Sequence, residues 1–344
     1  MLVGILVVWI DYSVPGLTFR WPLRARAGTV TTRMYTESRR SWSHMTEHRL
    51  EFRDSEHPWA PTAAVAEINA RTGSGLELVG LDVQTGGTSG AAYVRWPDGR
   101  DGVLTRSAIS LDWMRRTAEV LSRLRSVGLP VPRHDLVISL SDGRLAVVQE
   151  RMPGRPASWV DAGRIDAMVR ANEQLAGVLR EDMPELPNCG ASSGDDYHRW
   201  CRALTTHGDR SRRLLRRIQE IERSAPSDLP GSDLVHPDYG LGNVLFDASG
   251  AISGIIDWNG GACRGDFRFA LLTLCNNLAA EGDQYGASPD ARTRLDAILG
   301  RIEPEVLRLY WARWTLVDVA QSIGERFPPS RIEHDLERGE ARLF

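Results

Sequence analysis

The most informative segment of the sequence reads Leu234-Val-His-Pro-Asp-Tyr-Gly-Leu-Gly-Asn-Val-Leu-Phe246, and the apolar residues 252–256 and Asp257-Trp258 follow it. Its composition predicts two short buried strands that carry polar residues at their ends. The polar exceptions among the Val, Leu, Ile and Gly residues are His236, Asp238, Asn243 and Asp257. Polar side chains in an otherwise apolar segment favour a functional site over a core, because cores exclude unpaired polar groups.

Three of these side chains are of the types that phosphoryl transfer needs. One carboxylate must orient or deprotonate the acceptor hydroxyl, and hard oxygen ligands must hold a Mg²⁺ ion that bridges the nucleotide phosphates. Asp238, Asn243 and Asp257 supply a carboxylate, an amide oxygen and a second carboxylate. The segment therefore contains the residue types that a phosphoryl-transfer centre needs.

Upstream, the sequence predicts a small antiparallel sheet. A short helix over 61–70 precedes strands over 76–83, 91–96 and 102–105, and a helix over 111–127 precedes strands over 135–140 and 145–149. Turn signals at Pro97-Asp-Gly99 and Ser141-Asp-Gly143 join neighbouring strands. The order strand, strand, strand, helix, strand, strand is complete by Glu150.

After residue 154 the pattern changes to long helices. We expect them over 163–180, 197–223, 267–278, 289–302 and 304–326. A mostly helical lobe thus follows a small sheet lobe, with the segment of His236 to Asp257 inside the helical lobe. Ligand sites commonly lie between two such lobes.

The spacing His236-x-Asp238-x-x-x-x-Asn243, with Asp257-Trp258 fourteen residues after the Asn, resembles the catalytic core of the aminoglycoside phosphotransferase and choline-kinase-like family. Residues 145–154 look like the hinge between the lobes of that family, and Arg264-Gly-Asp266 looks like its Gly-Asp-Pro segment. The resemblance covers about residues 75–320. It implies an α+β, bilobal protein-kinase-like fold, with a small antiparallel-sheet N-lobe that has one helix and a larger, mostly helical C-lobe.

The resemblance also implies a role for each residue of the site. Asp238 would be the catalytic base or orienting carboxylate, and Asn243 and Asp257 would hold Mg²⁺. His236 and Asp266 would be structural residues near the site. The nucleotide, ATP with GTP left open, would contact a glycine-rich loop, the end of the third strand and the hinge, at Gly86, Gly87, Thr88, Ser89, Thr105, Arg106, Glu150 and Met152.

The chain departs from the family pattern where that pattern has a phosphate-binding lysine. The third strand reads Val103-Leu-Thr-Arg106, and all 42 basic residues of the chain are Arg. In a regular strand Arg106 points to the face opposite Thr105, so only a bulge would bring it to the phosphates. The helical Glu that pairs with the family's lysine falls on Thr117, and Pro237 replaces a usual Gly.

Two functions stay open at this point. One is an active small-molecule kinase that moves the γ-phosphate of ATP to a hydroxyl of a small, cationic metabolite or antibiotic. The other is a catalytically impaired pseudokinase that acts as a nucleotide-sensing or interaction protein. Because Asp238, Asn243 and Asp257 are all present, we expect the active enzyme, with an amine-bearing alcohol as acceptor. Asn276, Asn277, Glu281, Asp283 and Tyr285 follow Asp266, and they either line such a pocket or belong to a solvated acidic loop at a helix end.

Composition excludes several other classes of protein. A formal net charge of −3 gives no basic field for nucleic acid. The apolar run 2–10 is too short to span a bilayer, so we expect no membrane partner. Four scattered cysteines form no disulfide framework and favour a reducing, cytoplasmic location. Composition leaves the oligomeric state open.

Residues 1–44 differ from the rest because they carry a net charge of +4 without helical or alternating periodicity. They are a degenerate targeting sequence, a functional basic arm, or translated upstream sequence with the true start at Met34 or Met45. We therefore expect a poorly ordered extension over 1–44, an N-terminal nucleotide-binding lobe over 60–152, and a helical C-terminal lobe over 153–344 with the catalytic loop and acceptor site.

Overall fold

The computed structural model describes residues 6–14, 17–25, 59–82, 90–179, 182–189, 195–224, 231–282, 285–325 and 327–344. The chain divides into two compact units, Met1–Glu51 and Phe52–Phe344. In the first unit, strands β1 (Leu6–Val14) and β2 (Leu17–Ala25) pair antiparallel as a hairpin. This hairpin lies inside the segment that we expected to be poorly ordered. All elements that follow belong to the second unit.

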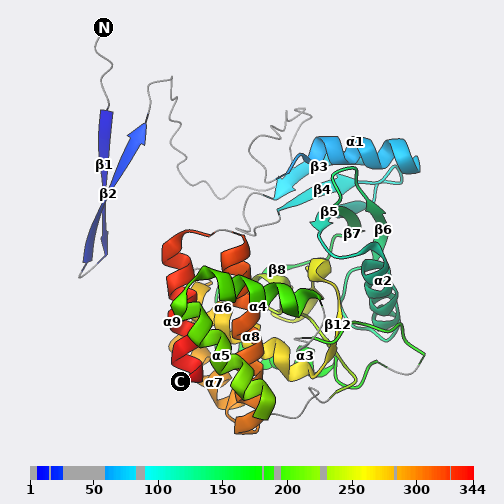
Figure 1. Ribbon diagram of the computed structural model, residues 1–344. Coiled ribbons are helices and arrows are strands. Elements are labelled where there is room, and N and C mark those ends of the chain that lie inside the picture. Colours follow the sequence, from blue (N-terminus) through cyan, green and yellow to red (C-terminus); the bar gives the residue numbers. More distant parts are fainter. Residues whose placement is uncertain are drawn as a thin grey trace. The chain divides into compact units, whose positions relative to one another are not determined.

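The N-terminal lobe of the second unit contains the expected antiparallel sheet (Figure 1). Its strand order is β3-β4-β5-β7-β6, and the chain enters it through helix α1 (Pro61–Thr72). The strands are β3 (Glu77–Asp82), β4 (Ala91–Arg95), β5 (Asp101–Ser107), β6 (His134–Ser139) and β7 (Leu145–Glu150). Helix α2 (Leu111–Ser126) connects β5 to β6, which confirms the predicted order of strands and helix.

The alternation of side chains along the strands divides the apolar residues of the sheet between two clusters. Leu104 and Val148 pack with Ile68 of α1. Val147 packs instead with Met114 at the start of α2. Further along α2, Val120, Leu121 and Leu124 join the core of the helical lobe, so α2 packs against both lobes.

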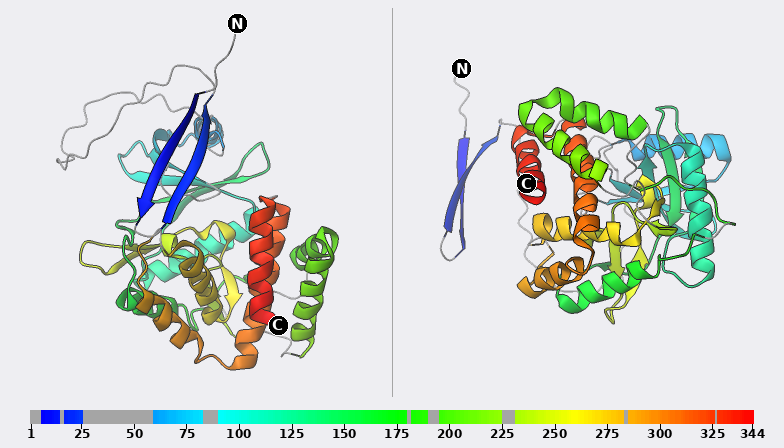
Figure 2. Two further views of the ribbon diagram at one scale, coloured as in Figure 1. Left: turned by 90° about the vertical axis from the view of Figure 1, so that its left-hand side faces the viewer. Right: turned by 60° about the horizontal axis from the view of Figure 1, so that its bottom comes forward.

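The C-terminal lobe is mostly helical, as predicted. Its helices are α3 (Ala162–Glu173), α4 (Asp195–His207), α5 (Asp209–Ser224), α6 (Ala270–Glu281), α7 (Pro289–Leu299), α8 (Pro304–Gly324) and α9 (Pro329–Leu343). The single helix predicted over 197–223 is wrong, because the chain breaks at Gly208 into α4 and α5. Helix α9 was not predicted; it buries Ile332 and Leu336 in a cluster with residues of α5 and α8 (Figure 2).

Short strands connect the helices around the segment 234–257. Strands β10 (Val244–Phe246) and β11 (Ile252–Ile255) form a hairpin, and β8 (Arg155–Pro156) adds to its β10 edge. Strand β9 (Asp233–Val235) pairs with β12 (Cys263–Gly265). The two short strands predicted within this segment are therefore present as β10 and β11. No helix among the described residues has the length and apolarity needed to cross a membrane.

Candidate active site

The β10–β11 hairpin brings Asn243 and Asp257 together. Val244 lies opposite Ile255 in the ladder, and the Ile256 amide donates to the carbonyl oxygen of Asn243 at 2.9 Å. Asn243 precedes β10 and Asp257 follows Ile256, so both side chains start from the same end of the hairpin. Local strand pairing alone is enough to place these two residues side by side.

Asn243 also holds Asp238, which is exposed. Its Nδ2 donates to the Asp238 carbonyl oxygen at 2.8 Å and to Asp238 Oδ2 at 3.0 Å. A carbonyl and a carboxylate only accept hydrogen bonds, so the NH₂ group of Asn243 must face Asp238 and its amide oxygen must face away. That oxygen is thus available to a cation, while the Asp238 carboxylate is fixed in orientation.

His236 holds the backbone of this loop through hydrogen bonds of both ring nitrogens. Its Nδ1 accepts from the Asp238 amide at 3.1 Å, and its Nε2 donates to the Ile256 carbonyl at 2.9 Å. The ring is fully buried and lies 4.2 Å, centroid to centroid, from the Trp258 ring. Burial lowers the pKa of His236, which favours the neutral ring, and the two hydrogen bonds set its tautomer. Both nitrogens are used in holding backbone, so the ring has a structural role.

Asp257 lies in a setting that suits a bound cation. Burial, followed by the nearby negative charge of Asp238, raises the pKa of Asp257 to about 6. A divalent ion would relieve both effects. No group of three or more His, Cys, Asp or Glu side chains gathers in the described part of the chain, so an ion held here would take Asp257 and Asn243 as protein ligands and complete its shell with phosphates and water. The donor set fits Mg²⁺.

The side chains of Thr105 and Arg106 lie on opposite faces of β5 and have different partners. Thr105 is buried, and its Oγ1 donates to Asn259 Oδ1 at 2.7 Å. Arg106 instead pairs with Asp142 and lies 5.6 Å from the centre of the Trp59 ring. The β5–β7 register is regular through both residues, without the bulge that would bring Arg106 to the phosphates. Of the two predicted contacts, the structure therefore brings only Thr105 to the site.

The predicted hinge contacts both lobes. Glu150 ends β7 and pairs with Arg125 of α2 at 2.8 Å. Met152 lies against β11, where a Cβ on Gly254 would come within 3.0 Å of the Met152 Cβ. The other predicted nucleotide contacts, Gly86, Gly87, Thr88 and Ser89, lie outside the described residues.

Asp266 lies in a structural position, as the sequence suggested. The structure identifies the hydrogen-bond partners of its carboxylate, which the sequence analysis did not name. Its carboxylate is buried and accepts from the Arg268 guanidinium, with Nη2 to Oδ2 at 2.6 Å, and from the Tyr310 hydroxyl. These bonds tie the start of α6 to α8. The sequence offered one signal for the pair, since Arg268 follows two residues after Asp266.

Two glycines of the loop that carries Asp238 allow close contact with Asn277 and Tyr285, two of the residues considered for the acceptor pocket. A Cβ on Gly240 would lie 1.8 Å from Asn277 Oδ1, and a Cβ on Gly242 would lie 2.8 Å from the Tyr285 hydroxyl. Asn277 and Tyr285 therefore border the loop that carries Asp238. Asn276 is buried, whereas Asp283 and the side chain of Glu281 lie outside the described part of the chain.

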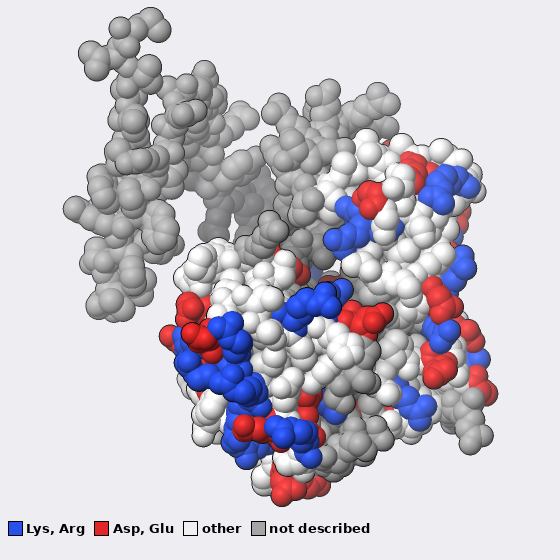
Figure 3. All heavy atoms as spheres, in the orientation of Figure 1, with Lys and Arg blue, Asp and Glu red and all other residues white. Residues whose placement is uncertain are grey.

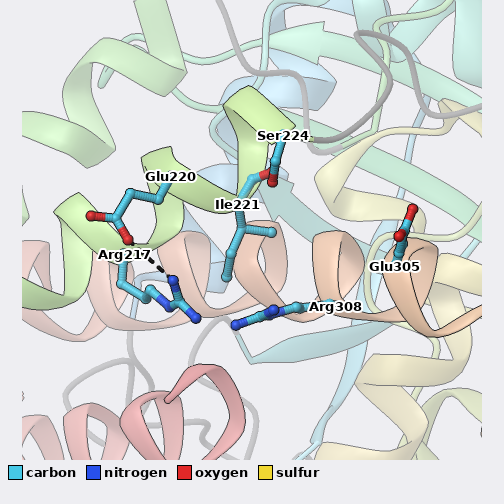
Figure 4. Close-up of a pocket in the computed structure, with 6 residues that line it drawn as sticks. All are labelled: Arg217, Glu220, Ile221, Ser224, Glu305 and Arg308. Carbon is cyan, nitrogen blue, oxygen red and sulfur yellow. Dashed lines mark hydrogen bonds and ion pairs between the residues drawn. The ribbon is translucent and has the colours of Figure 1, made fainter.

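A separate pocket of about 190 Å³ between α5 and α8 contains none of these residues (Figure 4). Arg217 and Arg308 line it, and both donate to the carbonyl of Leu343, while Arg217 also pairs with Glu220. Arginines gather on the surface over α5 with carboxylates beside them (Figure 3). Such pairing indicates a structural surface rather than a ligand site.

Comparisons with known proteins agree with the bilobal fold. The family model described as Phosphotransferase enzyme family matches residues 84–310. A search of the curated proteins returns no match.

Three solved structures show the likeness of the fold. An aminoglycoside-3′-phosphotransferase of type VIII is 26% identical, with a TM-score of 0.52, over 73% of this chain and 98% of its own. Aminoglycoside phosphotransferase APH(4)-Ia is 19% identical, with a TM-score of 0.58, over 82% of this chain and 98% of its own. Amicoumacin kinase hAmiN, in complex with AMP-PNP, Ca²⁺ and Ami, is 14% identical, with a TM-score of 0.58, over 83% of this chain and 93% of its own.

Proposed function

The chain belongs to the phosphotransferase enzyme family, and from this premise we propose that it transfers the γ-phosphate of ATP, with Mg²⁺, to a hydroxyl group of a small amine-bearing alcohol. The observation that carries the proposal is the joint placement of Asp238, Asn243 and Asp257. Asn243 orients Asp238 through Nδ2, and the β10–β11 hairpin sets its backbone opposite Ile256, next to Asp257.

The residues of the chain would divide the chemistry among them. Asp238 would accept a hydrogen bond from the acceptor hydroxyl and take its proton as the new oxygen–phosphorus bond forms and the β,γ-bridging bond breaks. Asn243 would keep the Asp238 carboxylate in position, and neutral His236 would hold the backbone under it. Bound Mg²⁺ would neutralise charge on the phosphates, with Asp257 and the amide oxygen of Asn243 as its ligands.

The neighbours support a nucleotide and a divalent ion. Amicoumacin kinase hAmiN was solved with AMP-PNP and Ca²⁺, and a thermostable mutant of APH(4)-Ia was solved as a ternary complex with AMP-PNP and hygromycin B. These structures share the fold of this chain at low identity. They support a nucleotide donor here, with ATP proposed and GTP left open.

For the acceptor, the proposal rests on the residues that border the catalytic loop. Asn277 offers an amide oxygen next to Gly240, and Tyr285 offers a hydroxyl next to Gly242. Both groups accept hydrogen bonds from an ammonium group, and the net negative charge of the chain attracts a cation. An amine-bearing alcohol fits this surrounding.

One observation favours the pseudokinase alternative. Thr105 stands where the family pattern has its lysine, and its hydroxyl donates to Asn259. In that alternative the chain would bind nucleotide without transferring phosphate, or would not bind it at all. The two functions therefore differ in nucleotide binding and turnover.

Thermal shift of the full chain with ATP or GTP, each with and without Mg²⁺, tests the binding site without an acceptor. We expect a Mg²⁺-dependent rise in melting temperature because ligands that bind only the folded state stabilise it. Asp257→Ala should abolish the rise, and Asp112→Asn, an exposed carboxylate on α2, is the matched control. Absence of any rise in the wild type would contradict nucleotide binding and favour the pseudokinase.

Turnover separates the two functions further. ADP release is measured with aminoglycosides, peptide antibiotics and amino alcohols as acceptors. Asp238→Asn should keep the nucleotide-dependent shift and lose about 10²- to 10⁴-fold in kcat, the usual contribution of a positioned general base. A wild type that binds Mg²⁺ and ATP but transfers phosphate to no acceptor, with Asp238→Asn indistinguishable from it, would support nucleotide sensing instead.

A further inference from the structure

A chain of hydrogen bonds runs from the N-terminal lobe to Asp257. Thr105 Oγ1 on β5 donates to Asn259 Oδ1 at 2.7 Å, and Asn259 Nδ2 donates to Asp257 Oδ1 at 2.6 Å. Residues 105 and 259 are 154 positions apart. The contact therefore depends on how the two lobes pack, and no motif in the sequence predicts it.

The direction of each bond is fixed by chemistry. An ionised Asp257 can only accept, so Asn259 must turn its NH₂ group toward Asp257 and its amide oxygen toward Thr105. That oxygen needs a donor, and the hydroxyl of Thr105 provides one. A side chain without a donor at position 105 would leave the amide oxygen of Asn259 unpaired and free the amide to rotate.

A second bond holds the same residue by its backbone. Ser107 Oγ donates to the Asn259 carbonyl at 2.7 Å. Ser107 and Thr105 are two residues apart, so they lie on one face of β5, and they are 3% and 5% exposed. Two buried hydroxyls of one strand thus fix both the backbone and the side chain of Asn259.

We propose that Thr105 and Asn259 are positioning residues that set the orientation of the Asp257 carboxylate toward its metal ion. The inference rests on the proposed function, since it assigns Asp257 as a metal ligand. In this arrangement the third strand of the lobe, which has no lysine, acts on the metal ligand through a neutral hydrogen-bond chain. Closure of the lobes and orientation of Asp257 are then coupled, because Thr105 and Asp257 belong to different lobes.

The test compares two buried threonines that both contact the segment after Asp257. Thr105→Val removes the donor to Asn259 and keeps the side-chain shape. Thr117→Val is the matched control, because Thr117 Oγ1 on α2 accepts from the Ala262 amide at 3.0 Å and has no bond to Asn259 or Asp257 in the described residues. Each variant removes one buried hydroxyl that joins α2 or β5 to the same segment.

Two measurements on the full chain report metal binding without turnover. The first is Mn²⁺ affinity by electron paramagnetic resonance in the presence of AMP-PNP, and the second is the Mg²⁺ concentration at half of the ATP-dependent thermal shift. We expect Thr105→Val to weaken Mn²⁺ binding on the order of tenfold, as loss of a residue that orients a metal ligand does. Thr105→Ser, which keeps the hydroxyl, should restore wild-type affinity, and Thr117→Val should leave it unchanged.

Asn259→Ala provides a second route if Thr105→Val does not fold. It should weaken Mn²⁺ binding at least as much, and the double variant with Thr105→Val should be no weaker than Asn259→Ala alone, since Thr105 acts through Asn259. Equal effects of Thr105→Val and Thr117→Val, or unchanged affinity in Asn259→Ala, would overturn the inference. Failure of the wild type to bind Mn²⁺ with AMP-PNP would instead contradict the proposed function.

Discussion

Asp257 is the one residue other than glycine that has a positive φ, 63°, in the described part of the chain. A left-handed backbone costs a non-glycine residue about 1 kcal/mol or more, so the surrounding contacts must hold it. Asn259 binds the carboxylate, and the next residue, Trp258, is fully buried with its ring against His236. The turn thus leaves the Asp257 carboxylate bonded to Asn259 while the Trp258 ring is buried in the core.

At the same scale, His134 on β6 gives a pH-dependent prediction away from the site. Burial lowers the pKa of His134 to about 4, against the opposing effects of Gln149 and Asp135. Between pH 6.5 and 4 the unfolded chain therefore binds a proton that the folded chain excludes. Stability should fall as the pH decreases through this window, by up to about 3 kcal/mol, and His134 contributes no such loss above pH 6.5.

Urea unfolding at pH 4.5, 5.5 and 7 measures this loss. His134→Gln should flatten the pH dependence relative to the wild type, whereas His198→Gln, at an exposed position on α4, should not. Parallel pH profiles of His134→Gln and the wild type would show that the ring is protonated in the folded state.

At the scale of elements, the β10–β11 hairpin links the hinge to the site. One end of the hairpin carries Asn243 and Asp257, and its β10 edge pairs with β8, directly after the hinge. Gly154 permits this pairing because its φ is +95° and a Cβ there would lie 2.2 Å from Ser253 Oγ and 2.7 Å from the Phe246 carbonyl. A glycine at the hinge thus lets the chain return onto β10, the strand that begins directly after Asn243.

Gly154→Ala should therefore lower the free energy of unfolding by about 2–4 kcal/mol, through backbone strain and steric overlap together. Gly143→Ala is the matched control, because Gly143 has a φ of +82° with no atom within 4 Å of its added Cβ, and it should cost only about 1 kcal/mol. Urea unfolding measures both variants. Equal losses would mean that the β8–β10 contact adds nothing to the strain.

At the scale of the whole molecule, the chain consists of two units that meet in sequence between Glu51 and Phe52. The first unit contains the β1–β2 hairpin, and a two-stranded hairpin is at best marginally stable by itself. The second unit contains both lobes, joined by the contacts of α2 and β5 with residues 257–262. We therefore expect the stability of the molecule to reside in the second unit.

Removal of residues 1–51 should change the free energy of unfolding of the remaining chain by less than about 1 kcal/mol. It should also leave the ATP-dependent thermal shift intact, because every residue assigned to the site lies beyond Glu51. Urea unfolding of the shortened chain beside the full chain checks the expectation. A loss of several kcal/mol would show that the first unit stabilises the second.

Much of the fold was predictable because it follows from short-range patterns. Alternating apolar residues predicted the strands of the sheet, and helical spacing predicted α2 and most helices of the C-terminal lobe. The turns that contain glycine predicted which strands are neighbours. The division of α4 from α5 was missed although the sequence contains a signal for it: Gly208 lies between Leu204 and Leu214, a stretch without an apolar residue. Helix α9 was also missed, although Ile332, Leu336 and Leu343 recur at helical spacing among its charged residues and pack against α5 and α8.

The sequence by itself determined the set of chemical groups at the site: His236, Asp238, Asn243 and Asp257 stand out as polar residues in an apolar segment, and strand pairing over a few residues brings them together. Only the tertiary structure decided that Thr105 binds Asn259 and that Arg106 pairs with Asp142. Their contacts depend on the register of β5 and on the packing of the lobes over 154 residues of chain. Short-range pairing is encoded locally, whereas a hydrogen bond between lobes exists only once the cores that position both partners have formed.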